Sequence, residues 1–264
     1  MNCLNSNDCE CTKDIDIIKM IPDLPLTLID IILAICIVTF GSVIQGSVGF
    51  GLGPFAVPLL FLINPIFVPG PLILAALLLT LLMFYRERTD VDFKGLKWAI
   101  VGRVLGTLIG AFVLTLISGS QMVVLLAGLV ILAVIINASG LRVKAVAWTI
   151  LSAGTLSGFM AIVAAIGGAP MALIYQDEAG PTIRSTLAGI FVIGIILALI
   201  SLVIIGKFGY TEFIAALWMM PGIITGFYIS SRTKKYLDRG YIRISVLTVS
   251  ALAAIVLIVR YFYL

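Results

Sequence analysis

The sequence predicts an all-α polytopic membrane protein made of two inverted repeats, with about eight to ten membrane segments. Three observations predict this class: an apolar composition, a series of long apolar stretches, and a glycine- and proline-rich break that occurs twice. Of the 264 residues, 61% are hydrophobic and 11% are charged, whereas a water-soluble domain carries roughly 25% charged residues. The chain therefore has too little polar surface to form a globule in water.

The apolar stretches divide the chain into segments. They cover 26–63, 69–85, 98–117, 121–141, 145–176, 181–206, 210–231 and 241–264. A helix needs about 20 apolar residues to cross a bilayer, so the first and fifth stretches are too long for one helix. Proline removes an amide donor and glycine loosens a helix, so we expect both to be interrupted, as broken helices or helical hairpins.

The two halves share sequence landmarks at matching positions. Gly46 and Pro58 lie twelve residues apart, and so do Gly158 and Pro170. In each half a tryptophan is then followed by glycines at four-residue spacing, at Trp98, Gly102 and Gly106 and again at Trp218, Gly222 and Gly226. Such small residues allow another helix to approach closely. We therefore expect a polar tail over 1–25, a first repeat over 26–141 and a second over 145–264.

The positive charges predict how the repeats are oriented. If each broken stretch crosses the membrane and returns, twelve Lys and Arg residues in 86–97, 142–144, 184 and 232–243 share one side, and only four lie on the other. Cytoplasmic loops carry an excess of Lys and Arg, which favours this arrangement over a single crossing. Each half then crosses an odd number of times, so the copies are inverted and both termini lie outside.

The two breaks are the first candidates for a binding site. Irregular backbone at membrane depth is tolerated only where protein buries it or water reaches it. Inverted-repeat carriers bind their substrates near the midplane, at broken helices whose positive N-termini suit anions. The candidate residues at the breaks are Gln45, Ser47, Gly49, Gly51, Gly53, Gly167 and Gly168. The alternative is that these glycines only permit close helix packing.

Two arginines are further candidates. Arg103 lies about a turn and a half inside its span, where a charge is expensive and usually functional; the alternative is that it snorkels to the headgroups. Arg184 follows Pro181 near an expected helix start, with Ser185 and Thr186 beside it. These three side chains suit an oxyanion, and the alternative is an ordinary cytoplasmic anchor.

The missing residue types exclude several functions. Histidine is absent, and no Asp or Glu lies deep in an expected span. Cys3, Cys9 and Cys11 lack a fourth ligand and match no zinc spacing. We therefore expect no catalytic residue, no metal and no cofactor. Proton-coupled carriers usually bury a carboxylate or histidine, so we favour the hypothesis of weakly coupled or uncoupled efflux of an anion, driven by the membrane potential.

The quoted residues resemble a known family. The run from Gln45 to Pro58 resembles the first signature of the TauE/SafE sulfite-exporter family of permeases. The runs from Gly167 to Tyr175 and from Pro181 to Ala188 resemble its second-half signature, and the repeated tryptophan–glycine pattern fits as well. The resemblance covers residues 28–262. One departure is that the first half has Pro69-Gly-Pro-Leu where the second half has Arg184, so the halves would contribute unequally to a site.

The resemblance implies a multi-pass transporter of the plasma membrane that moves sulfite, organosulfonates or related sulfur-containing anions, and export is the direction we expect. The partners it implies are a small anionic solute and the lipid bilayer, with no nucleic acid, and assembly into a homo-oligomer is left open. Two alternatives stay open at this point. One is a permease for another small anion such as a carboxylate, and the other is a membrane assembly subunit that transports nothing.

Overall fold

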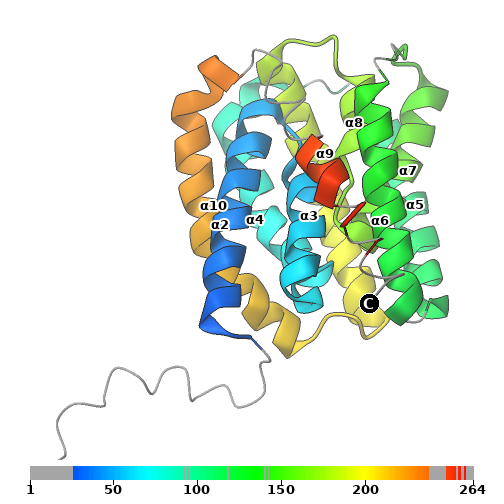
Figure 1. Ribbon diagram of the computed structural model, residues 1–264. Helices are drawn as coiled ribbons and strands as arrows, with labels where there is room; N and C mark the ends of the chain where they lie inside the picture. The colour runs from blue at the N-terminus through cyan, green and yellow to red at the C-terminus, as the bar shows by residue number, and fades with distance from the viewer. Residues whose placement is uncertain are drawn as a thin grey trace, which may run out of the picture.

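Figure 1 shows the computed structural model of the chain, a bundle of helices standing side by side. The structure describes residues 26–91, 93, 95–117, 119–139, 141, 143–237, 248–253, 255–256 and 259. Within these residues the regular structure is helical, without strands, which confirms the all-α prediction. The polar tail expected over 1–25 lies outside the described residues.

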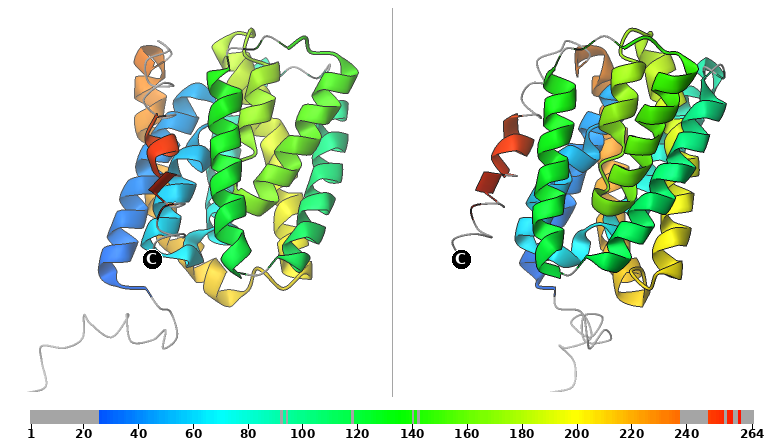
Figure 2. Two further views of the ribbon diagram at one scale, coloured as in Figure 1. Left: turned by 45° about the vertical axis from the view of Figure 1, so that its right-hand side comes forward. Right: turned by 90° about the vertical axis from the view of Figure 1, so that its right-hand side faces the viewer.

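The helices follow the apolar stretches closely. They are α2 (Leu28–Val48), α3 (Leu52–Ile63), η1 (Pro65–Phe67), α4 (Gly70–Glu87), η2 (Arg88–Asp90), α5 (Leu96–Leu116), α6 (Gly119–Ala138), α7 (Ala147–Ala164), α8 (Gly168–Ile174), α9 (Gly180–Ile204) and α10 (Tyr210–Leu237). Seven of these are long and apolar enough to cross a membrane: α2, α4, α5, α6, α7, α9 and α10. The turned views in Figure 2 show them running roughly parallel to one another.

Local signals explain where the first broken segment begins and is interrupted. Thr27 and Asp30 form a reciprocal capping box at the start of α2, which satisfies two backbone donors. The helix ends at Gly49, whose φ of 104° is in the left-handed region that glycine tolerates. Gly51 follows with a φ of 129° and begins α3. In the second half α7 ends at Ala165, which also has a positive φ, of 55°.

Both broken segments turn back at the interruption. Leu52 packs against Gly41, and Gly51 against Ile44, so the 12-residue α3 returns beside α2. In the second half Gly167 lies beside Ser157, so the chain doubles back along α7 before the 7-residue α8 begins. The long stretches are therefore helical hairpins rather than single kinked crossings.

The repeated glycines make the two closest helix pairs. Gly102 and Gly106 of α5 have no room for a side chain, because the backbone of Leu151 and Thr155 in α7 lies against them. Gly222 and Gly226 of α10 pack in the same way on Ile35 and Thr39 of α2. The prediction of small-residue packing is confirmed. Helix α5 of the first half thus packs against α7, the first helix of the second half, and α10 of the second half packs against α2, the first helix of the first half (Figure 1).

The helix ends form two faces of different charge. On one, which we call the basic face, the ends of α2, α4 and α10 meet the start of α9, since Arg86 donates to the carbonyl oxygen of Gly46 at 2.6 Å and to Ser231 Oγ at 2.9 Å. At the opposite face Gly70 packs against Phe208. Helix α2 begins at the opposite face and α7 at the basic face. This is the arrangement expected of inverted copies, and the duplication itself stays a prediction.

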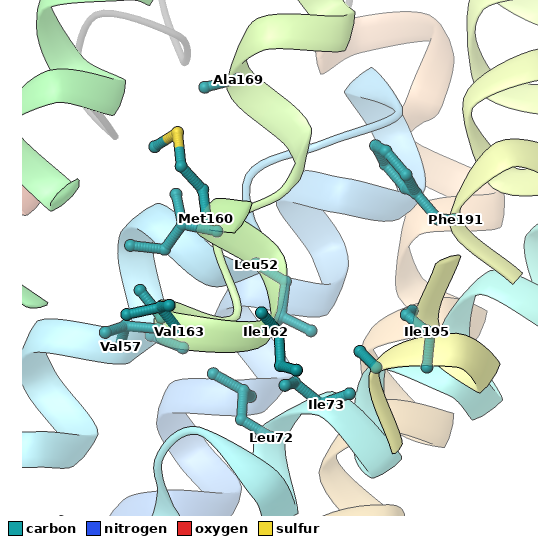
Figure 3. Close-up of a cluster of buried hydrophobic side chains, with 14 of the residues drawn as sticks. Leu52, Val57, Leu72, Ile73, Met160, Ile162, Val163, Ala169, Phe191 and Ile195 are labelled. Carbon is teal, nitrogen blue, oxygen red and sulfur yellow. The ribbon is translucent and has the colours of Figure 1, made fainter. Parts of the chain in front are cut away.

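A continuous apolar core surrounds the two hairpins. Figure 3 shows part of it, where Leu52 and Val57 of α3 lie with Leu72 and Ile73 of α4 and with Ile162 and Val163 of α7. The short helices α3 and α8 also pack against α6. The core therefore packs around both turns inside the bundle, where long helices enclose them.

Candidate functional site

The two breaks lie in direct contact. A Cβ atom on Gly53 would overlap the carbonyl oxygen of Ala165, and one on Gly168 would come within 2.9 Å of the Phe50 Cβ. Only glycine leaves room for the backbones to meet at these two positions. The breaks are 112 residues apart in sequence, counting from Gly53 to Ala165, and the fold brings them together in the interior.

A cavity of about 50 Å³ lies where the breaks meet. Its lining comes from both breaks and from the helices α4, α5, α7 and α9: Gln45, Gly51, Gly53, Pro54, Ile73, Ala76, Thr80, Arg103, Ala161, Ala165, Gly167, Gly168, Phe191, Ile195 and Ala198. A volume of this size holds about three or four water-sized groups. Six of the residues proposed from sequence line this cavity: Gln45, Gly51, Gly53, Arg103, Gly167 and Gly168.

Arg103 supplies the positive charge of the cavity. Its side chain is 1% exposed, so it does not snorkel to the membrane surface. Nη1 donates to Ser157 Oγ at 2.9 Å, and this hydroxyl in turn donates to the carbonyl oxygen of Gly167 in the second break. The guanidinium carbon stands 5.2 Å from the centre of the Phe191 ring, a cation–π distance.

Two glycines create the space that Arg103 occupies. A Cβ on Gly194 of α9 would overlap the guanidinium nitrogens, and one on Gly158 of α7 would overlap the Arg103 backbone. These glycines let the helices approach closely on two sides of the arginine. The guanidinium is consequently held in one place, between α7 and α9, and is aimed at the breaks.

The charge of Arg103 is not neutralised within the part of the chain that the structure describes. The two ion pairs there join Glu87 to Arg86 and to Arg184, and neither involves Arg103. Its buried Nε has no hydrogen-bond partner. Because a buried charge without a partner is strongly unfavourable, an unpaired guanidinium at this depth creates a strong preference for an anion.

Gln45 and the start of α3 add neutral donors on the other side of the cavity. The Gln45 side-chain oxygen accepts from the Leu52 amide at 3.2 Å, which leaves its amide nitrogen as the free donor end. The N-terminus of α3 also lies at the cavity through Gly51 and Gly53. Helix N-termini carry a partial positive charge, so the start of α3 adds to the preference of Arg103 for a negative solute.

The remaining sequence candidates lie outside the cavity, toward the basic face. Arg184 is 4% exposed, and its Nε lies 2.7 Å from Glu87 Oε2 while its Nη1 donates to the Ser47 carbonyl oxygen at 3.2 Å. Ser185 Oγ donates to the Thr182 carbonyl oxygen at 3.2 Å, within the first turns of α9. Gly49 packs against the Arg184 side chain, and Thr186 is buried.

Sequence reasoning missed several residues that matter here. Glu87 belonged to the charged loop expected after residue 85, but it is 5% exposed and pairs with Arg184. Gly194 gave no signal, because a glycine inside an apolar helix has many roles. Ser157 did give one, since it occupies the position in the second half that matches Gln45 in the first. In the described part of the chain, no three His, Cys, Asp or Glu residues gather as metal ligands.

Comparison with known proteins agrees with this architecture. No curated protein and no solved structure matches the chain. The family model described as sulfite exporter TauE/SafE matches residues 33–257, which include both breaks and Arg103. The chain therefore belongs to the sulfite exporter TauE/SafE family and is a multi-pass transporter of the plasma membrane.

Proposed function

We propose that this transporter moves a small sulfur-containing oxyanion, sulfite or an organosulfonate, out of the cell, and that the anion binds beside Arg103 where the two breaks meet. The observation that carries the proposal is the buried guanidinium of Arg103, which has no carboxylate partner in the described chain and lines an interior cavity. A bound anion would neutralise that charge.

The polar groups of the cavity suit an oxyanion with several acceptor oxygens. Ser157 binds only Nη1 of Arg103, and a guanidinium carries five N–H donors, so the side chain keeps donors for an anion. The Gln45 amide nitrogen offers a second donor from the first break. Charge-assisted hydrogen bonds of this kind are roughly twice as strong as neutral ones, so one anion held by both breaks would stabilise their contact.

Cavity size favours sulfite over larger sulfonates in the described conformation. The volume of about 50 Å³ is enough for a compact anion, a single sulfur with its pyramid of oxygens. The neighbouring walls are apolar, formed by Ile73, Ile195 and Phe191. An organosulfonate would place its carbon chain against these side chains and would require the cavity to widen.

The direction we propose follows from the charges in the cavity. Its lining includes an arginine but no Asp, Glu or His, so it offers no side chain suited to carrying a proton with the anion. A membrane potential that is negative inside drives an anion outward by about 2.3 kcal/mol per 100 mV for each negative charge that it carries. Export driven by potential therefore needs no further coupling group in this site.

Flux from proteoliposomes tests the proposal. Vesicles are loaded with radiolabelled sulfite at alkaline pH, the pH gradient is collapsed with a protonophore, and a potassium diffusion potential is imposed. We expect potential-driven sulfite efflux that Arg103→Gln abolishes and Arg88→Gln preserves, since Arg88 lies outside the cavity against Tyr85. Absence of sulfite flux would reject the proposal.

The same assay separates the alternatives. Parallel vesicles contain methanesulfonate, sulfate or acetate in place of sulfite. A carboxylate permease, whose guanidinium would bind acetate in the same cavity, would move acetate in preference to sulfite. A chain that only assembles with other membrane proteins would move none of the four anions.

A further inference from the structure

Three charged side chains are linked at the basic face. Arg184 Nε lies 2.7 Å from Glu87 Oε2, and Arg86 Nε lies 3.2 Å from Glu87 Oε1. The same arginines hold the end of the first hairpin helix, since Arg86 donates to the Gly46 carbonyl oxygen and Arg184 to that of Ser47. We call Arg86, Glu87 and Arg184 the charged network. It fastens α4 and α9 to the end of α2.

The charged network lies on the helices that line the cavity, directly on its basic-face side. Glu87 follows Thr80 by seven residues on α4, and Arg184 precedes Phe191 by seven on α9. Residues seven apart share one face of a helix and are separated by about 10 Å along it. On α2, Gly46 and Ser47 come immediately after Gln45. An anion entering from the basic face therefore meets the network before it reaches Arg103.

Toward the opposite face, only a short stretch of helix separates the cavity at the breaks from a second, larger cavity. A second cavity, of about 350 Å³, lies toward the opposite face and is lined by Gly70, Leu202, Lys207 and Glu212, among others. Gly70 is one turn from Ile73 on α4, and Leu202 is one turn from Ala198 on α9, so about 5 Å of helix separates the two cavities. The described state is thus closed toward the basic face.

We propose that Arg184 and Glu87, braced by Arg86, form the inner gate of the transport path, which an entering oxyanion opens by taking the place of the Glu87 carboxylate on Arg184. The identity of the competing anion rests on the proposed function, whereas the closure of the path does not. The basic face is the cytoplasmic one, because positive loops mark that side.

The charges of the network explain why an anion opens the gate. Two guanidinium groups share one carboxylate, so the gate carries a surplus positive charge that attracts anions from the cytoplasm. Opening without an anion would leave Arg184 buried and unpaired, which is strongly unfavourable. Exchange of one oxyanion for another avoids that state. Beside the network, the buried Ser47 Oγ has no hydrogen-bond partner and is available to the entering anion.

Accessibility of a cysteine in the cavity tests the gate. Thr80→Cys is introduced into a chain whose four native cysteines are replaced by alanine, and its reaction with membrane-impermeant thiosulfonates is timed in inside-out vesicles. Two reagents are compared, one cationic and one anionic. We expect Glu87→Gln and Arg184→Gln each to accelerate both reagents at least tenfold, whereas Glu87→Asp, which keeps the charge, stays close to the parent rate.

The two reagents separate opening of the gate from a change of local field. If the substitution changed only the local electric field, the reaction of one reagent would accelerate and that of the other would slow. Either that result or unchanged rates for both reagents would overturn the proposal. Arg88→Gln is the matched control on the same helix end and should leave both rates unaltered. Arg88 lies against Tyr85 and outside the network.

A second test leaves the charged network unmodified, so its outcome does not depend on whether the variants of Glu87 or Arg184 fold correctly. Methanesulfonate, which does not consume the reagents, is added to vesicles containing Thr80→Cys alone. We expect it to accelerate labelling severalfold, with half-saturation at a defined concentration, and chloride at equal ionic strength to have no effect. No acceleration by methanesulfonate would refute opening by the anion. If the unmodified protein showed no sulfite flux in proteoliposomes but gave the expected labelling results, the proposed substrate would be refuted and the gate proposal would still hold.

Discussion

Gly53 in the first break lies directly against the carbonyl oxygen of Ala165 in the second, and this contact joins the two halves of the transporter in its interior. It leaves no space for a side chain on Gly53. The break that contains it begins with Gly49 and Gly51, both at positive φ, and the opposing break begins with Ala165, also at positive φ. Two turns that both contain residues at positive φ therefore pack directly against each other.

Gly53→Ala should destabilise the fold. The added Cβ meets backbone rather than a movable side chain, so the breaks must separate, and overpacking of this kind costs about 1–3 kcal/mol. Thermal unfolding of the purified protein measures the change. Gly128→Ala on α6 is the matched control, because its Cβ would point into open space. A Tm for Gly53→Ala equal to that of the control would contradict the close contact of the breaks.

Gly194→Ala should damage the anion site while leaving the helices intact. Alanine favours a helix, but its Cβ would occupy the space of the Arg103 guanidinium. We expect the stabilisation of the protein by sulfite, which scales with the logarithm of ligand concentration over Kd, to be lost. The measurement is the shift of Tm with added sulfite. A normal shift would show that the position of Arg103 is unimportant for binding.

Ser157→Ala should weaken anion binding more modestly. Ser157 connects Arg103 Nη1 to the Gly167 carbonyl oxygen, and a hydrogen bond to a charged group contributes about 1.5–3 kcal/mol. We therefore expect roughly a 10- to 100-fold increase in Kd for sulfite, measured by titration calorimetry. Ser152→Ala is the control on the same helix, since its exposed hydroxyl bonds only the Thr149 carbonyl oxygen. Equal affinities for the two variants would remove Ser157 from the site.

Arg103→Gln should separate binding from stability. A buried charge without a counter-ion is unfavourable, and its removal offsets the loss of the hydrogen bond to Ser157, so the Tm without ligand should stay close to that of the parent. The increase of Tm with sulfite should disappear. Both values come from one set of melting curves. A large fall of the ligand-free Tm would indicate that Arg103 is a structural residue, contrary to our account.

The orientation of the two faces can be tested with single cysteines. Lys144 lies at the basic face before α7, and Lys207 at the opposite face between α9 and α10. In intact cells we expect an impermeant maleimide to label Lys207→Cys directly and Lys144→Cys only after permeabilisation. Labelling of both from outside would overturn the predicted orientation and the inverted arrangement that depends on it.

Patterns along the sequence predicted the parts of the fold that depend on local chemistry. Apolar length predicted the long helices, and glycine with proline predicted both interruptions. The glycines at four-residue spacing predicted the faces where helices approach, as at Gly102 and Gly106. An arginine inside an apolar span predicted a special role for Arg103, since few arrangements make a buried charge favourable.

The remaining features depend on contacts between distant segments. Glu87 and Arg184 are 97 residues apart, and neither neighbourhood indicates that the other is its partner. Arg184 was therefore a candidate for the same site as Arg103, and the structure places it in a separate cluster. The space beside Arg103 depends on Gly194, whose role becomes visible only when α5 and α9 are packed together.

The most direct test of the central claim is to locate the bound anion. Selenite, a heavier analogue of sulfite, can be soaked into crystals of the chain with its cysteines replaced by alanine, and found by its anomalous scattering. We predict one selenium peak within about 5 Å of the Arg103 guanidinium, as oxygens hydrogen-bonded at about 2.8 Å require, and its loss in Arg103→Gln. A peak elsewhere in the bundle that persists in Arg103→Gln, with none in this cavity, would contradict the account.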